Sequence, residues 1–128
     1  RKIMNNPENL FYTKEHEWAE FKDEKVIIGI TDFAQSQLGD VIFIEFPEVG
    51  QEISAGDVFG EVEAVKTVSE LFTPLSGKVV EVNDELENSP EQVNGDPYGS
   101  GWLIKIDPSD LSEKDELMDS DSYEKFVG

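Results

Sequence analysis

One lysine stands at the centre of a nearly palindromic run of apolar and acidic residues, GEVEAVKTVSEL, which spans residues 60–71. Reading outward from Lys66 and Thr67, valine matches valine, glutamate matches glutamate and valine matches leucine. A lysine in such a setting can be a Schiff-base nucleophile, an acceptor for a covalently attached carrier group, or a solvated side chain that keeps a loop in water.

The acidic neighbours of Lys66 argue against the nucleophile. A Schiff-base lysine reacts as the uncharged amine, whereas nearby carboxylates favour the charged ammonium. Glu61, Glu63 and Glu70 are the charged residues closest to Lys66 in the sequence. The carrier acceptor and the solvated loop lysine therefore remain the two alternatives at this point.

The palindromic run must bend, because a single strand from Val58 to Phe72 would exceed the usual length of 3–10 residues. We predict a hairpin that folds back between Val65 and Val68, with Lys66 at its tip. Neither Lys66 nor Thr67 is a favoured turn residue, which indicates a role for the lysine outside folding. The predicted cross-strand pairs are Val65–Val68, Ala64–Ser69, Glu63–Glu70 and Val62–Leu71.

Short alternating or β-branched segments predict the elements that hold this hairpin. Seven strands separated by glycine, proline and asparagine turns are typical of an antiparallel sandwich or barrel. The expected strands are residues 16–21, 26–30, 40–46, 58–65, 67–72, 78–82 and 102–106.

Helices are expected to be few and short. Residues 31–40 offer Thr31 or Asp32 as N-cap and Gly39 beyond the last turn. Residues 89–94 have the pattern of a capping box, with Ser89 as N-cap, Pro90 next and Gln92 at the third position. From Pro108 onward one or two helices are expected, whose inward-facing side chains would be Leu117, Met118, Tyr123, Phe126 and Val127.

Composition limits the partners of the chain. Its 128 residues suit one domain, and a formal net charge of −19 repels nucleic acid and anionic membranes, so the expected partners present basic surfaces. The chain has no cysteine, no run long and apolar enough to span a membrane, and no apolar signal-peptide core in its first ten residues.

Other candidate sites lack the residues that they require. His16 is the only histidine, so without cysteine it cannot seed a zinc site, and we expect a hydrogen-bonded structural role for it. Glu61 and Glu63 are not part of a calcium-binding loop pattern, and the GSG motif before Trp102 lacks the lysine of a phosphate loop. No metal site and no catalytic residue is therefore predicted.

Residues 50–84 resemble the lipoyl and biotinyl carrier domains, with Gly50 sixteen residues before Lys66 and Gly77 eleven after it. The flanking motifs YTKEHEW, VIIGITDFAQSQLGDVIFIEFPEVG and VNGDPYGSGWLIKI are similar to the H-protein family of the glycine cleavage system, and the resemblance covers essentially the whole chain. One departure is EAVKT around the lysine, where many members have ESVKA, so Ala64 and Thr67 differ. Biotin acceptors usually have methionine on both sides of the lysine, and this chain has Val65 and Thr67.

The resemblance implies a mainly β barrel-sandwich hybrid with short peripheral and C-terminal helices. It would be a single lipoyl-carrier domain over residues 1–128, with a core at about residues 26–106 and a helical segment at about 108–127. Lys66 would carry covalent lipoic acid. The acidic residue of the HEW motif and the one four positions after the lysine, Glu17 and Glu70, would contact the aminomethyl-loaded arm, since carboxylates stabilise a cationic amine.

The resemblance further implies a carrier without catalytic turnover. It would pass an aminomethyl group from glycine decarboxylase (P protein) to aminomethyltransferase (T protein), and dihydrolipoamide dehydrogenase (L protein) would reoxidise it. A lipoylating enzyme is the fourth expected partner. A monomer is expected, in the mitochondrial matrix of a eukaryote or the cytoplasm of a bacterium. The alternatives are a lipoyl or biotin carrier of another complex and an acidic protein-interaction module without a prosthetic group.

Overall fold

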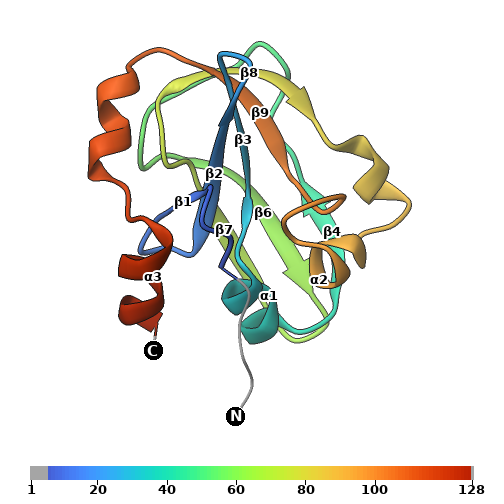
Figure 1. The fold of residues 1–128 in the computed structure, drawn as a ribbon. Helices are drawn as coiled ribbons and strands as arrows, with labels where there is room; N and C mark the ends of the chain where they lie inside the picture. Colours follow the sequence, from blue (N-terminus) through green and yellow to red (C-terminus); the bar gives the residue numbers. More distant parts are fainter. Residues whose placement is uncertain (1–5, 128) are drawn as a thin grey trace.

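Two antiparallel sheets and several short helices make up the computed structural model, which describes residues 6–127 (Figure 1). The first residues, in which no signal-peptide core is expected, lie partly outside this range. The larger sheet has the order β1-β2-β3-β9-β8-β5 and the smaller one β4-β6-β7. The strands are β1 (Phe11–Tyr12), β2 (Glu17–Lys22), β3 (Lys25–Ile30), β4 (Val41–Glu45), β5 (Glu52–Ile53), β6 (Val58–Ala64), β7 (Val68–Phe72), β8 (Gly77–Val82) and β9 (Ile104–Pro108).

The helices lie at the periphery of the two sheets (Figure 1). None of those in residues 6–127 combines the length and the apolar character that crossing a membrane requires. The α-helices are α1 (Asp32–Leu38), α2 (Gln92–Gly95) and α3 (Ser120–Val127), and the 3-10 helices are η1 (Asp84–Glu87) and η2 (Leu111–Glu116).

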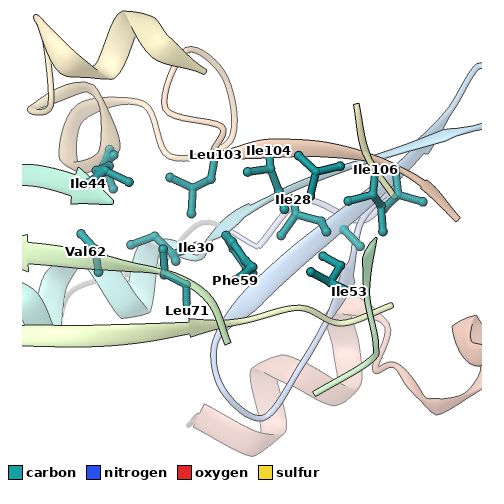
Figure 2. Close-up of a cluster of buried hydrophobic side chains, with 14 of the residues drawn as sticks. Ile28, Ile30, Ile44, Ile53, Phe59, Val62, Leu71, Leu103, Ile104 and Ile106 are labelled. Atoms are coloured by element: carbon teal, nitrogen blue, oxygen red, sulfur yellow. The ribbon is translucent and has the colours of Figure 1, made fainter. Parts of the chain in front are cut away.

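The main core lies between the sheets, because alternate residues of each strand face inward. From β3 and β9 come Ile28 and Ile104, and from β6 and β7 come Val62 and Leu71, all of them buried. Figure 2 shows these side chains meeting from both sheets. The core fixes the smaller sheet, and with it the β6–β7 hairpin, against the larger one.

A second buried cluster attaches the C-terminal segment to the other face of the large sheet. Tyr123 of α3 stacks on Tyr12 of β1, with ring centroids 4.6 Å apart and planes 10° from parallel. Tyr12 also pairs through its backbone with Met118, and Trp18 of β2 belongs to the same cluster. The amino-terminal strand and the last helix are thus held together.

The sequence predictions of the main elements are confirmed. All seven predicted strands are present, and the two unpredicted ones, β1 and β5, have only two residues each. α1 begins after Thr31, whose hydroxyl accepts a hydrogen bond from the Ala34 N–H, and it ends at Leu38, directly before Gly39, whose φ is +79°. Both ends are as expected, since glycine adopts positive φ without strain.

Two local predictions are wrong. The capping box at Ser89 does not form: α2 starts at Gln92, and the Gln92 side chain accepts a hydrogen bond from the Ser100 hydroxyl instead of reaching back. The backbone before α2 instead makes tight turns, in which Val93 N–H donates to Pro90 O. In α3, both Tyr123 and Phe126 were predicted to face inward. Tyr123 is buried as predicted, but Phe126 is 47% exposed.

Candidate functional site

Lys66 occupies the tip of the β6–β7 hairpin. Ala64 N–H donates to Thr67 O at 2.8 Å and closes the turn, so that the loop itself consists of Val65 and Lys66. Val65 N–H donates to Asp40 O at 3.0 Å, which ties the loop to the residue that precedes β4. Both loop side chains are exposed. The turn is therefore fixed by its backbone while the lysine projects into solvent, as predicted.

The predicted pairing of the two strands is wrong by two residues. The structure places Glu63 opposite Val68 and Glu61 opposite Glu70, because the turn is centred on Val65 and Lys66, not on Lys66 and Thr67. Side chains alternate with a period of two along a strand, so a two-residue difference in register leaves every side chain on the same face. The hydrophobic pattern could not distinguish the two registers.

Glu17 is almost completely buried, with 2% of its surface exposed. The Thr13 hydroxyl donates to its Oε1 at 2.8 Å, and the Phe72 N–H of β7 donates to its Oε2 at 3.2 Å. β7 lies at an edge of the small sheet, so the Phe72 N–H has no acceptor on a neighbouring strand of that sheet. The Glu17 carboxyl group accepts its hydrogen bond instead. Burial raises the pKa of Glu17 to about 8, although the hydrogen bonds from Thr13 and Phe72 act in the opposite direction.

Glu17 and Glu70 line one cleft of about 150 Å³ between β7, α1 and the residues that lead into β2. His16, Ser69 and Leu38 also line it, and Glu70 is exposed. Lys66 is not among the lining residues, but it precedes Glu70 by four positions on the same hairpin. The structure therefore brings the two predicted glutamates together beside the hairpin that carries the lysine.

Among the lining residues that were not predicted as site residues, two adjoin the predicted glutamates. Ser69 and His16 are next to Glu70 and Glu17 in the sequence, which is the only signal that could have indicated them. Both line the cleft together with the two glutamates.

His16 is held in a chain of hydrogen bonds, which confirms the structural role predicted for it. Its Nδ1 lies 2.8 Å from the hydroxyl oxygen of Tyr123, which lies 2.7 Å from Oγ1 of Thr31. Burial lowers the pKa of His16, despite the opposing effect of Glu15. The imidazole beside the cleft is consequently uncharged at neutral pH.

Acidic groups do not assemble into a metal centre in the described part of the chain. Residues 6–127 contain no group of three or more histidine, aspartate or glutamate side chains placed to hold an ion. The chemical groups that the site provides are the exposed amine of Lys66 and the carboxyl groups of Glu17 and Glu70 in the nearby cleft.

Comparison with known proteins identifies the family. The family model described as Glycine cleavage H-protein matches residues 10–128. The chain belongs to this family. It is 56% identical over 124 residues to the glycine cleavage system H protein of Oceanobacillus iheyensis, an alignment that covers 97% of this chain and 98% of the relative. The corresponding protein of a Geobacillus species is 57% identical with the same coverage.

A solved structure agrees with this assignment. The crystal structure of a glycine cleavage system H protein from Mycobacterium marinum superposes with a TM-score of 0.88 at 41% identity, covering 95% of this chain and 98% of that one. The two sheets described above form the predicted mainly β barrel-sandwich fold. The chain is accordingly a component of the glycine cleavage system, a lipoyl carrier and not a catalyst.

Proposed function

We propose that Lys66 is the lipoylated residue and that the loaded chain serves the three enzymes of glycine cleavage in turn: the decarboxylase, the aminomethyltransferase and dihydrolipoamide dehydrogenase. The observation that carries this proposal is the exposed lysine at the tip of a two-residue hairpin loop in a chain of this family. A side chain in that position can enter the active site of another protein without disturbing the fold.

The residues present fit a lipoyl group. When bound, lipoate supplies a disulfide that can be reduced and a thiol that can hold a one-carbon amine. Its attachment forms an amide between Lys66 Nζ and an activated lipoyl carbonyl, while the activating group departs and the lysine ammonium loses two protons. The rigid turn around Val65 and Lys66 gives the lysine a fixed base, and tethering raises the local concentration of the arm at a docked enzyme.

The cleft is suited to bind the cationic amine of the loaded arm. Glu70 offers an exposed carboxylate at its edge, and Glu17 offers a buried carboxyl group at its wall. With a pKa near 8, Glu17 is mostly neutral at pH 7, and it can ionise when a cation enters, since an opposite charge stabilises the carboxylate. His16 is uncharged beside it and does not repel the cation.

Mass spectrometry tests the attachment site. The chain is co-expressed with a lipoylating enzyme and lipoate, and the intact mass and peptide map are recorded. We expect one lipoyl increment in the wild type and in the matched control Lys78→Arg, which removes another exposed lysine, and none in Lys66→Arg. An unmodified wild type, with an enzyme that modifies another acceptor, would contradict the proposal and favour the acidic interaction module.

A further inference from the structure

The outward face of the small sheet exposes apolar side chains beside Lys66. In β4 a register shift between Val41 and Phe43 turns two successive side chains outward, where regular alternation would bury one of them. Ile42 is 49% exposed and Phe43 is 54% exposed. Phe43 lies opposite Glu63 of β6, which lies opposite the exposed Val68 of β7.

Three carboxylates form the next row of the same face. Glu45, Glu61 and Glu70 lie opposite one another across the three strands. Like charges in directly opposite positions destabilise a sheet, so this row has an energetic cost. Neither of the two ion pairs found within residues 6–127 includes any of the three glutamates. Internal pairing therefore does not account for the row.

The apolar side chains, the acidic row and the lysine form one continuous surface. Phe43 and Glu63 are directly paired, and Glu63 is three residues before Lys66 on the same hairpin. The exposed Val65 stands next to the lysine in the loop. We call this surface the hairpin face and define it by Ile42, Phe43, Glu45, Glu61, Val65, Val68 and Glu70.

We infer that the hairpin face is the docking surface for the enzyme that acylates Lys66. The inference rests on the proposed function. The surface requires a partner with an apolar recess, which Ile42 and Phe43 would enter, bordered by lysine or arginine side chains that face the acidic row. A net charge of −19 and the unpaired glutamates provide the charge complementarity with such a partner.

Geometry singles out the acylating enzyme among the partners. Amide formation requires Lys66 Nζ itself to enter the active site, so the enzyme must contact the protein around the base of that side chain. The hairpin face is the surface that borders this base. Enzymes that act on the far end of a long, flexible arm can bind the protein at a greater distance from the lysine.

The apolar part of the inference is tested by lipoylation kinetics of the double variant Ile42→Ser/Phe43→Ser. We expect kcat/KM to fall roughly tenfold or more, mainly through KM, because a few anchor residues dominate most interfaces. The matched control Val49→Ser/Leu111→Ser removes two side chains that are each 62% exposed outside the hairpin face, and it should keep the wild-type rate. Ile42→Thr/Phe43→Thr repeats the test with residues that favour strands, and thermal midpoints check that each variant is folded.

The charged part is tested with Glu45→Gln/Glu61→Gln. This variant should lower kcat/KM at low salt and weaken the dependence of kcat/KM on salt. The control Glu48→Gln/Glu52→Gln makes the same change in charge at two exposed glutamates outside the hairpin face and should have neither effect.

Three outcomes would overturn the inference. Wild-type kinetics in both hairpin-face variants would show that the enzyme docks elsewhere. A dimer in sedimentation that Ile42→Ser/Phe43→Ser dissociates, with unchanged lipoylation, would assign the surface to a second copy of this chain. A wild-type chain that an active lipoylating enzyme does not modify would remove the proposed function itself, and the inference with it.

Discussion

The carboxyl group of Glu17 connects the two sheets at the scale of a single residue. It belongs to β2 of the large sheet and accepts a hydrogen bond from Phe72 N–H at the edge of the small sheet. It also lines the cleft beside Glu70. A substitution of Glu17 should therefore change the stability of the fold as well as the chemistry of the cleft, and the two effects must be measured separately.

The raised pKa of Glu17 predicts a pH-dependent stability. Between about pH 4.5 and 8 the group is ionised in the unfolded chain and protonated in the folded one, so its contribution to folding is present in full below pH 4.5 and is lost as the pH rises through 8. The change amounts to about 1.4 kcal/mol for each unit of pKa difference. We expect Glu17→Gln to remove this slope, as measured by urea denaturation at pH 5 and pH 8.

Glu20 provides the control for this experiment, since it lies on the same strand and is half-buried. Glu20→Gln should keep the wild-type slope. If Glu17→Gln showed the same decrease in stability between pH 5 and pH 8 as the wild type, Glu17 would not be the group that titrates.

The contact between Gly29 and Trp18 allows no side chain. A Cβ atom at Gly29 would lie 2.6 Å from the indole ring, which cannot move away easily because Trp18 Nε1–H donates to Pro97 O at 3.1 Å. We expect Gly29→Ala to lower the free energy of unfolding by about 1–3 kcal/mol, measured by chemical denaturation. In Gly95→Ala, where no atom lies within 4 Å of the added Cβ, the change should be below about 1 kcal/mol. Equal effects in both variants would refute the steric explanation.

At the scale of elements, one hydroxyl group connects three segments. The Tyr123 hydroxyl of α3 lies within hydrogen-bond distance of His16, before β2, and of Thr31, which caps α1. The last helix is thus connected to two of the segments that form the cleft. Changes in α3 should consequently be detected at His16, although α3 itself does not line the cleft.

Tyr123→Phe removes this connection and leaves the ring stacking on Tyr12 in place. Because His16 and Thr31 lose a buried partner, we expect the free energy of unfolding to fall by about 1–3 kcal/mol. The NMR signals of the His16 ring should shift in the same variant. Unchanged stability together with an unchanged His16 spectrum would contradict the proposed connection.

Periodicity and cap residues were sufficient to predict the longer elements. The β-branched run of β3 and the Thr31 and Gly39 signals of α1 are local, and both elements are present in the structure as predicted. The hairpin register was not predictable, because shifting the pairs by two residues keeps each side chain on its face. The two-residue strands β1 and β5 lack a pattern long enough to detect.

The candidate site was predictable only in part. The palindromic pattern predicted that Lys66 lies at a hairpin tip, whereas the roles expected for Lys66, Glu17 and Glu70 came from the resemblance to the family. That the two glutamates share a cleft depends on the packing of β2 against β7, which is a tertiary contact between residues far apart in the sequence. The burial of Glu17, and with it its raised pKa, follows from the same contact.

At the scale of the whole molecule, the net charge of −19 predicts electrostatically steered association. Raising the ionic strength from low to physiological shortens the Debye length from about 30 Å to about 8 Å and should weaken binding to the glycine-cleavage enzymes by roughly tenfold. Surface plasmon resonance at several salt concentrations measures this, and the effect is expected mainly in the association rate. An affinity independent of salt would exclude steering.

Decarboxylation of glycine by the partner enzyme tests whether Lys66 carries the reactive group. Carboxyl-labelled glycine is incubated with the pyridoxal-phosphate decarboxylase and the lipoylated chain, and labelled CO₂ is counted. We expect release of labelled CO₂ that saturates with the concentration of the lipoylated chain and is absent with Lys66→Arg prepared in the same way. The absence of release from the lipoylated wild type, in an assay where a lipoylated relative supports release with the same enzyme, would contradict the carrier role of Lys66.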